Sequence, residues 1–311
     1  RKTGAGTLIL SGENTYKGAT VVDGGNLVVA GRVDGTGGML QNSDVLVHPD
    51  GLLLGDGEIS KTLLNTGRVL PGWRGDTLTV GSYTQTEAGA MLIAFGPQGG
   101  HGALQATTAD LKGNLLLTPR QNVFYPNALS LTLRDMVTAT GPLTGNFAQV
   151  GVWSTSPTLD FSLAAHDMRG NNAVLGVSRA ADVYSRYADS AGAASVGRAL
   201  PGVASTARGN MRALLAALDW SSTGGSDVRR GLAQLGSEAY DAAGRASLLQ
   251  QREFTSLLLR RMLGNESMRR MGSRRAARDE PLPSWQVWLT PFGSSAVRQD
   301  HGGTAGWASS G

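Results

Sequence analysis

The chain has 311 residues, a formal net charge of +4 and no cysteine, so thiol catalysis, thiolate metal sites and a disulfide framework are excluded. Hydrophobic residues make up 41% of the sequence and charged residues 17%, which excludes a disordered, highly solvated chain. The 44 glycines follow no three-residue collagen period and are typical of many tight turns between short strands.

The first part of the chain, residues 1–119, repeats one pattern in which a glycine precedes a short β-branched or leucine run. The pattern occurs, for example, in Gly6-Thr-Leu-Ile-Leu, Gly51-Leu-Leu-Leu and Gly113-Asn-Leu-Leu-Leu. These runs are too short for helices and are bounded by turn residues, so they predict strands. Their irregular spacing, about one to two dozen residues, is typical of a solenoid whose loops vary while its coils stack. The sequence therefore predicts a right-handed parallel β-helix.

A β-sandwich is the main alternative, because it too is built from short strands separated by turns. The strands of a sandwich alternate apolar and polar residues. In contrast, Leu8-Ile9-Leu10 and Leu52-Leu53-Leu54 are apolar at every position, as expected of strands packed inside a stack. The β-helix is therefore favoured over the sandwich.

Residues 120–178 keep the character of strands, but their apolar residues alternate with polar ones. Leu129, Leu131 and Leu133 are each separated by one polar residue. This alternation indicates a sheet with one exposed face. Because a solenoid needs a polar terminal cap to prevent end-to-end aggregation, we interpret residues 120–178 as a C-terminal β-rich cap.

From residue 179 to residue 264 the sequence predicts helices instead of strands. The spacing is helical in the stripe formed by Met211, Leu214, Leu215 and Leu218. Ser226 is a candidate N-cap for a further helix. Three glycines interrupt the segment that follows it, so the pattern fits one long helix or two.

The end of the chain predicts a connector and a strand. Residues 265–284 have the composition of a solvated, arginine-rich connector. In residues 285–311, the segment that begins at Trp285 alternates side chains over about ten residues, the length of a transmembrane barrel strand. One strand cannot span a bilayer alone. We therefore expect the first strand of a transmembrane β-barrel whose other strands the sequence does not contain, and we expect Arg1 to mark a cut into a longer protein.

Three motifs resemble one family. The stretch from Gly4 to Val29 resembles the passenger-associated transport repeat of autotransporters. Gly67-Arg-Val-Leu-Pro-Gly, followed by Thr77-Leu-Thr-Val-Gly-Ser-Tyr-Thr-Gln, is similar to the autochaperone segment of that family, which places autochaperone coils at about residues 67–119. The segment from Leu235 to Met262 is similar to the linker before the barrel, most like that of subtilisin-like serine protease autotransporters.

This resemblance implies type V secretion, in which a passenger threads through its own C-terminal barrel in the outer membrane of a Gram-negative cell. Folding outside the cell, begun at the autochaperone coils, would bias the chain outward. The implied partners are the chain's own C-terminal β-barrel, the outer-membrane barrel assembly machinery, periplasmic chaperones and host-surface proteins. The implied location is the outer membrane or cell surface, with release of the passenger left open. The linker residues that would face the barrel lumen are Ala239, Ala242, Ala243, Ala246 and Ser247.

The sequence predicts no catalytic, cofactor or metal site. Its four histidines lie in glycine-rich turns without metal or triad spacing, and it has no Gly-x-Ser-x-Gly or phosphate-loop motif. We therefore expect no enzyme activity and no cofactor in this segment. The nine arginines between Arg245 and Arg278 have one interleaved aromatic residue, Phe254, so nucleic acid is not an expected partner.

Three functions stay open from the sequence. In the first, the segment is a stalk and folding module for export. In the second, it belongs to a subtilisin-like serine protease whose catalytic domain lies upstream of Arg1. In the third, it is an adhesin that uses the integrin-type tripeptide Arg74, Gly75 and Asp76, although turn composition alone also explains that tripeptide. A Gly-Thr-Ser motif before Arg1 would favour the protease.

Overall fold

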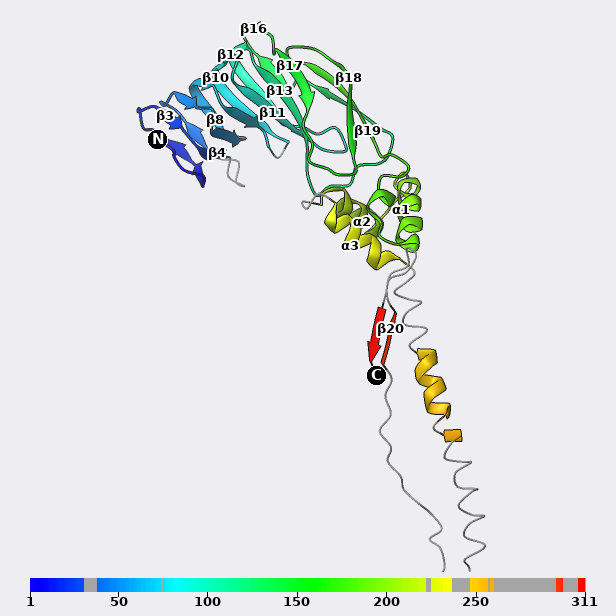
Figure 1. Ribbon diagram of the computed structural model, residues 1–311. Helices are drawn as coiled ribbons and strands as arrows, with labels where there is room; N and C mark the ends of the chain where they lie inside the picture. The colour runs from blue at the N-terminus through cyan, green and yellow to red at the C-terminus, as the bar shows by residue number, and fades with distance from the viewer. Residues whose placement is uncertain are drawn as a thin grey trace, which may run out of the picture. The chain divides into compact units, whose positions relative to one another are not determined.

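The computed structural model of the protein describes residues 1–30, 38–73, 75–221, 225–236, 247–256, 258–259, 295–298 and 307–310 (Figure 1). The chain divides into two compact units. The first unit contains Arg1–Val183 and Leu200–Val228, and the second contains Tyr184–Ala199 and Arg229–Gly311. Both parallel sheets lie in the first unit.

A seven-stranded parallel sheet forms one wall of the first unit. Its strands, in spatial order, are β1 (Thr7–Ser11), β4 (Gly25–Ala30), β7 (Gly51–Gly55), β9 (Arg68–Pro71), β11 (Ala90–Phe95), β13 (Asn114–Pro119) and β17 (Gln149–Val152). Six of these seven strands begin at or next to a glycine of the repeated pattern. The glycine-led runs are therefore strands, as the sequence predicts.

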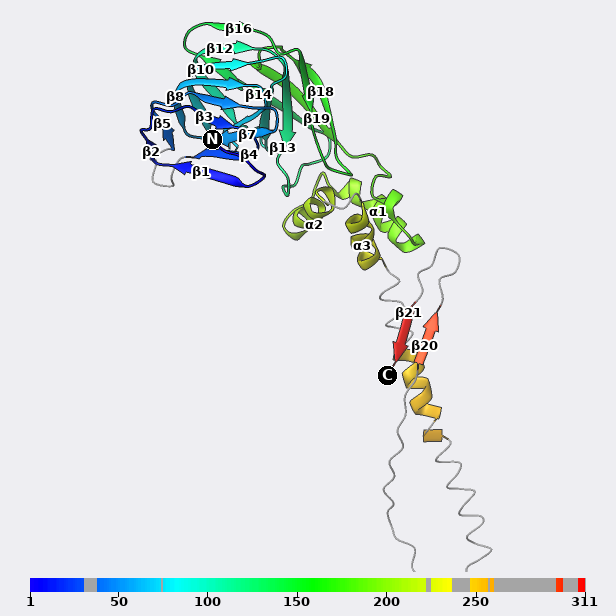
Figure 2. The ribbon, with the colours of Figure 1, turned by 60° about the vertical axis from the view of Figure 1, so that its left-hand side comes forward.

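The second wall is a nine-stranded sheet. Its main path is β15 (Val137–Ala139), β12 (Ala103–Leu111), β10 (Thr77–Gln85), β8 (Glu58–Asn65), β5 (Met39–Leu40) and β2 (Glu13–Asn14), with β16 (Leu143–Gly145) paired to β12, β6 (Val45–Val47) to β8, and β3 (Thr20–Val22) to β6. Figure 2 shows β12, β10 and β8 side by side. Every pairing within both walls is parallel.

The chain alternates between the two walls, since β8, β10 and β12 lie in one and β9, β11 and β13 in the other. Parallel pairing throughout excludes the antiparallel β-sandwich, because sandwich strands are joined by hairpins and Greek-key connections. The mainly β architecture is compatible with a parallel β-helix. The coils differ in length by about a factor of two, as solenoid loops do, because Leu52 pairs with Arg68 whereas Asn114 pairs with Gln149.

The core is a column of aliphatic side chains between the walls. One row of it consists of Leu27, Leu53, Val69, Met91 and Leu115, which are neighbours across five successive strands and are all 0% exposed. Burial of each such side chain stabilises the fold by about 1.5–3 kcal/mol. Each rung thus gains its apolar contacts from the rungs on either side of it.

Glycines let the coils approach one another at the corners. A Cβ on Gly67 would lie 1.9 Å from the carbonyl oxygen of His48, and one on Gly113 would lie 2.3 Å from that of Gly89. Gly113 also has a φ of +62°, a conformation that other residues rarely adopt. Close packing of stacked corners therefore requires glycine at these positions.

A three-stranded antiparallel sheet follows the coils, in the order β14 (Leu129–Arg134), β19 (Asn172–Ser178) and β18 (Asp160–His166). Leu131 and Leu133 are buried while the residues between them are exposed, which confirms the alternation read from the sequence. The parallel walls continue beyond residue 119, because β15 and β16 pair with β12, and β17 pairs with β13.

The helical region contains several helices. They are the 3-10 helix η1 (Ser185–Tyr187) and the α-helices α1 (Ala191–Val203), α2 (Asn210–Asp219) and α3 (Ser226–Leu235), and residues 247–256 are helical too. The predicted stripe of Met211, Leu214, Leu215 and Leu218 lies in α2, and α3 begins at the candidate N-cap Ser226. No helix among the described residues is long and apolar enough to cross a bilayer.

The predicted arginine-rich connector and the strand that begins at Trp285 lie outside the described residues. After them, β20 (Ser295–Arg298) and β21 (Trp307–Ser310) form an antiparallel pair in the second unit.

Candidate functional site

Three polar side chains lie together inside the coils, among the mostly apolar side chains of the core. Asn65 ends β8, Gln85 ends β10 directly beside it, and Tyr83 precedes Gln85 on the same face of β10. All three side chains are fully buried. We call Asn65, Tyr83 and Gln85 the polar stack.

The polar stack is closed by hydrogen bonds among its own members. Asn65 Nδ2 donates to Gln85 Oε1 at 3.1 Å and to the Tyr83 hydroxyl oxygen at 3.2 Å. The Tyr83 hydroxyl donates to Gln85 Oε1 at 2.6 Å. Burial raises the pKa of the Tyr83 phenol above its ordinary value, and the hydrogen bond from Asn65 opposes this only in part. The phenol therefore stays neutral, and its hydroxyl can donate the hydrogen bond to Gln85.

The same side chains bind the backbone of neighbouring coils. Asn65 Nδ2 donates to the carbonyl of Ala90 at 3.2 Å, and Gln85 Nε2 donates to the carbonyls of Lys112 at 2.7 Å and Asn114 at 3.1 Å. The backbone N–H of Gly67 donates to Asn65 Oδ1 at 3.0 Å. Three successive coils are thus joined at one corner, and a slip in register would leave these buried groups without partners, at about 1–3 kcal/mol each.

The polar stack lies at the start of the predicted autochaperone coils. Sequence reasoning did not single out its residues, because an asparagine or glutamine next to glycine has the signature of a turn. The signal that was available is the repetition of Asn65-x-Gly67 and Gln85-x-x-x-Gly89, in which an amide side chain precedes the glycine at successive corners.

The Arg-Gly-Asp tripeptide lies between β9 and β10. Arg74 lies outside the described residues, while Gly75 and Asp76 are exposed. The N–H of Gly75 donates to the carbonyl of Gly72 at 2.7 Å, and the carbonyl of Asp76 accepts from Ala103 at 3.1 Å. A Cβ on Gly75 would lie 2.5 Å from Arg120 Nη2, so this turn packs closely on the next loop. Adhesion through these residues stays a prediction.

The predicted lumen-facing residues are mostly outside the described part of the chain. Ala239, Ala242, Ala243 and Ala246 are not described, and Ser247 is the exposed first residue of the helical segment 247–256. Their role therefore also stays a prediction.

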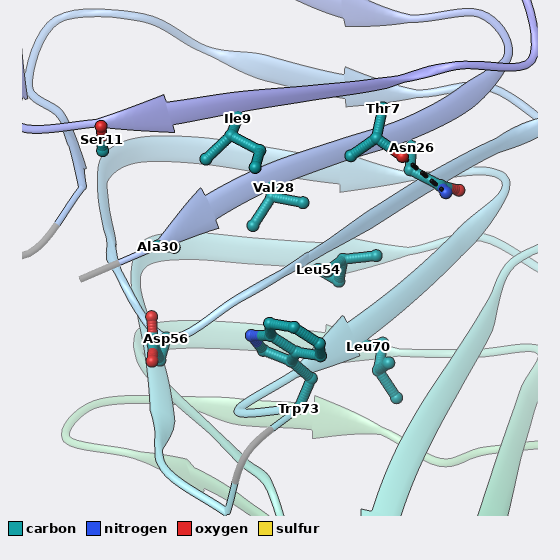
Figure 3. A pocket seen from close by; sticks show the side chains of 10 residues that line it. All are labelled: Thr7, Ile9, Ser11, Asn26, Val28, Ala30, Leu54, Asp56, Leu70 and Trp73. Atoms are coloured by element: carbon teal, nitrogen blue, oxygen red, sulfur yellow. Dashed lines mark hydrogen bonds between the residues drawn. The ribbon is translucent and has the colours of Figure 1, made fainter. Parts of the chain in front are cut away.

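A surface pocket of about 510 Å³ lies on the outer face of the seven-stranded sheet (Figure 3). Its floor is a row of aliphatic side chains, Ile9, Val28 and Leu54, that are neighbours on β1, β4 and β7. In Figure 3 this row leads to the indole of Trp73. Ile9 is 61% exposed. Leu54 is buried, as the sequence predicts for its run, whereas Leu8 and Ile9 in the run of the first coil are exposed.

The acidic and histidine side chains of the described residues were compared with the arrangements that metal and catalytic sites require. Among the described residues, no group of three histidine, aspartate or glutamate side chains is placed to hold a metal ion. His48 Nδ1 lies 2.6 Å from Asp23 Oδ1, a pairing between successive coils that the sequence spacing did not reveal. A hydrogen bond from Arg1 holds the pKa of the Asp23 carboxyl below its ordinary value. These contacts join two corners of the stack.

Comparison with known proteins gives two matches. Residues 1–29 match the family model of the passenger-associated-transport-repeat. The chain is also 30% identical over 207 residues to the "Extracellular serine protease" of Serratia marcescens. Together they support an autotransporter passenger.

The two matches differ in extent. The family match includes the segment from Gly4 to Val29 that carries the resemblance in the sequence, with β1 and all but the last residue of β4. The match to the Serratia protein covers 64% of this chain but only 19% of that relative. The chain thus spans about a fifth of the relative's length.

Proposed function

We propose that this segment is the stalk and folding module of an autotransporter, and that it promotes translocation of an upstream domain through a C-terminal barrel. The observation that carries the proposal is the polar stack, which ties three successive coils together by buried hydrogen bonds inside residues 58–119. Because each coil gains its contacts from its neighbours, a coil that is already folded is a template for the next one.

The physical link to export is the free energy released as coils stack. A coil that leaves a pore unfolded buries its leucines and pairs its backbone only after it reaches a folded neighbour. Return of that coil through the pore would require the same interactions to break. Coils tied in register by Asn65 and Gln85 would start this process, in keeping with the autochaperone role that the resemblance assigns to residues of about 67–119.

Several finer features belong to this proposal. The coils are taken as right-handed, and the β14–β19–β18 sheet is taken as the cap that ends the solenoid. The proposed partners are the protein's own C-terminal barrel, the outer-membrane barrel assembly machinery and periplasmic chaperones. The antiparallel sheet supports a role as cap because its alternating pattern gives it one apolar and one polar face.

The proposal is tested by export of the full-length protein carrying Gln85→Leu. This change keeps much of the side-chain volume but removes every hydrogen bond of the amide. The matched control is Gln105→Leu, because Gln105 is an exposed glutamine on β12 in the same coils. We expect surface display to fall several-fold for Gln85→Leu only. If the Gln85→Leu protein folds measurably less well after purification but is displayed at the wild-type level, the export role is wrong.

A second candidate is that the whole protein is a subtilisin-like serine protease with its catalytic domain upstream. The likeness to the Serratia relative, which is named an extracellular serine protease, favours it. The test is to treat the full-length protein with a serine-directed fluorophosphonate probe, and labelling upstream of Arg1 would support it. Both candidates are compatible, since the folding module would then export a protease domain.

The adhesin alternative depends on the loop before β10. Its test is Asp76→Glu, which keeps the charge but lengthens the side chain of the tripeptide. Reduced attachment to integrin-bearing cells would support adhesion, and unchanged attachment would end it.

A further inference from the structure

The last coils end at a cluster of four aromatic rings from four separate places in the chain. Phe95 ends β11, Tyr125 follows β13, Phe161 lies on β18, and Trp220 directly follows α2. The Tyr125 and Phe161 ring centroids are 5.4 Å apart, and the Trp220 ring lies 5.9 Å from Tyr125 and 6.4 Å from Phe161. Trp220 is only 9% exposed. All four residues belong to the first unit.

The polar atoms of this cluster are paired with the backbone. The indole N–H of Trp220 donates to the carbonyl of Val123 at 2.7 Å, across 97 residues of sequence. The Tyr125 hydroxyl donates to the carbonyl of Phe95 at 2.8 Å, and burial raises the pKa of that phenol above its ordinary value. The indole is therefore held by both an aromatic pocket and a directed hydrogen bond.

The residue before Trp220 forms a buried ion pair. The Arg179 guanidinium binds the carboxylate of Asp219, and both side chains are 0% exposed. The Thr158 hydroxyl donates to Asp219 Oδ1 at 2.5 Å, and the Ser156 hydroxyl donates to the Asp219 carbonyl at 2.6 Å. Loss of one partner of such a pair leaves an uncompensated buried charge. Asp219 is thus bound from two sides by residues of the preceding β region.

Helix α2 contributes to the same apolar core. Ala216 and Trp220 pack in one cluster with the aliphatic column of the coils. In α2, Leu215 and Leu218 are buried as well. Within the helical region that the sequence predicts at residues 179–264, Leu200–Val228 belongs to the same compact unit as the coils.

We propose that residues 210–221 are a latch, a segment of the chain that docks on the end of the last coils and completes the folding module. The proposal rests on the proposed function and extends it, because the module then reaches Ser221 instead of ending near residue 119. The Trp220 ring contacts Tyr125 and Phe161, and these two rings pack on Phe95 of β11, so the latch docks only after β11, the segment around Tyr125 and β18 have come together. Its docking seals the aromatic end of the core from water.

The test uses the full 311-residue chain and compares Trp220→Ala with Trp153→Ala. Trp153 is a matched control, since it is a tryptophan of the same unit that is 54% exposed. Hydrogen–deuterium exchange is measured on peptides from β11 and β13, which do not contain either substitution. We expect exchange there to quicken roughly 100-fold or more for Trp220→Ala and to change less than about twofold for Trp153→Ala.

A milder variant keeps the test decisive if Trp220→Ala does not fold. Trp220→Phe keeps an aromatic ring in the pocket but removes the N–H that donates to Val123. We expect roughly tenfold faster exchange in β11 and β13, because the Val123 carbonyl loses its donor. Exchange in both Trp220 variants equal to that of Trp153→Ala would overturn the latch.

Export measurements separate the latch from the proposed function. If the Trp220 variants behave like wild type while Gln85→Leu is exported poorly, the latch is wrong and the export role of the coils stands. If the Trp220→Phe and Gln85→Leu proteins both lose exchange protection yet are exported normally, the latch stands as part of the fold and the export role falls. Loss of protection together with loss of export supports both.

Discussion

The sharpest perturbation of the polar stack is Asn65→Asp, which changes one atom type and almost no volume. Asn65 Nδ2 donates to Gln85, Tyr83 and the backbone of Ala90. In the variant an oxygen takes the place of this donor and faces three other oxygens. The introduced carboxyl group is fully buried, so its ionised form is disfavoured and its folded-state pKa rises above the unfolded value of about 3.9.

The magnitude follows from the cost of keeping that carboxyl protonated. Between an unfolded pKa of about 3.9 and pH 7 there are about 3.1 pH units, and at 1.36 kcal/mol each this is about 4 kcal/mol. The lost donor adds about 1–3 kcal/mol at any pH. Since the folded pKa is raised, the native state binds more protons, and the penalty grows as pH rises above the unfolded pKa. When the pH is lowered from 7 to 4, the Asn65→Asp protein should therefore regain most of about 4 kcal/mol in its free energy of unfolding, relative to wild type.

Urea unfolding at the two pH values measures this effect in the purified chain. The control is Asn42→Asp, because Asn42 is exposed and receives the same chemical change. The control should differ from wild type by less than about 1 kcal/mol at both pH values. An Asn65→Asp penalty that is the same at pH 7 and pH 4 would show that the side chain is hydrated, and the argument from a closed, buried stack would then be refuted.

Three further predictions follow from the coils and their corners. Gly67→Ala should destabilise the first unit by more than about 2 kcal/mol in urea unfolding, because its Cβ would lie 1.9 Å from the His48 carbonyl oxygen. The control is Gly6→Ala, whose Cβ would have no atom within 4 Å, and it should leave the free energy of unfolding nearly unchanged. Tyr83 and Tyr125 have raised pKa values, so stability should fall as pH rises above about 10, and tyrosinate absorbance should show two phenols that ionise only on unfolding. The pKa of Asp23 is lowered, chiefly by the hydrogen bond from Arg1. The contribution of Asp23 to stability is therefore present above about pH 4 and is lost as pH falls through the folded pKa. Asp23→Asn should reduce the loss of stability in acid, measured by urea unfolding at several pH values.

The coils could be predicted because their physical cause is local. Leu52-Leu53-Leu54 follows Gly51, and this short sequence already contains both a corner and a strand. The structure places Leu53 in the buried column and Leu54 on the outer face beside Val28. Periodicity alone could not tell which face of the run is closed, because that depends on what packs outside it.

The polar stack and the latch could not be predicted, because their residues have local signatures of something else. Asn65 and Gln85 are typical of turns, and Asp219-Trp220 is an ordinary end of an amphipathic helix. Their partners lie far away in sequence, 20 residues for Asn65 with Gln85 and 40 for Asp219 with Arg179. Only the register of the coils brings such residues together, and register is a property of the folded chain.

The position of the buried polar groups bears on how the coils would fold in order. An aliphatic column such as Leu53, Val69 and Met91 is tolerant of changes in its side chains, since apolar exchanges that conserve volume usually cost less than about 1.5 kcal/mol. A buried amide is not tolerant, because a shift by one residue leaves its donors unpaired. Highly register-specific contacts are made by Asn65 and Gln85 at the start of the predicted autochaperone coils, and by Asp219 and Trp220 at the aromatic end of the core. If folding begins at these coils, contacts that form in one register only would ensure that the first coils stack correctly.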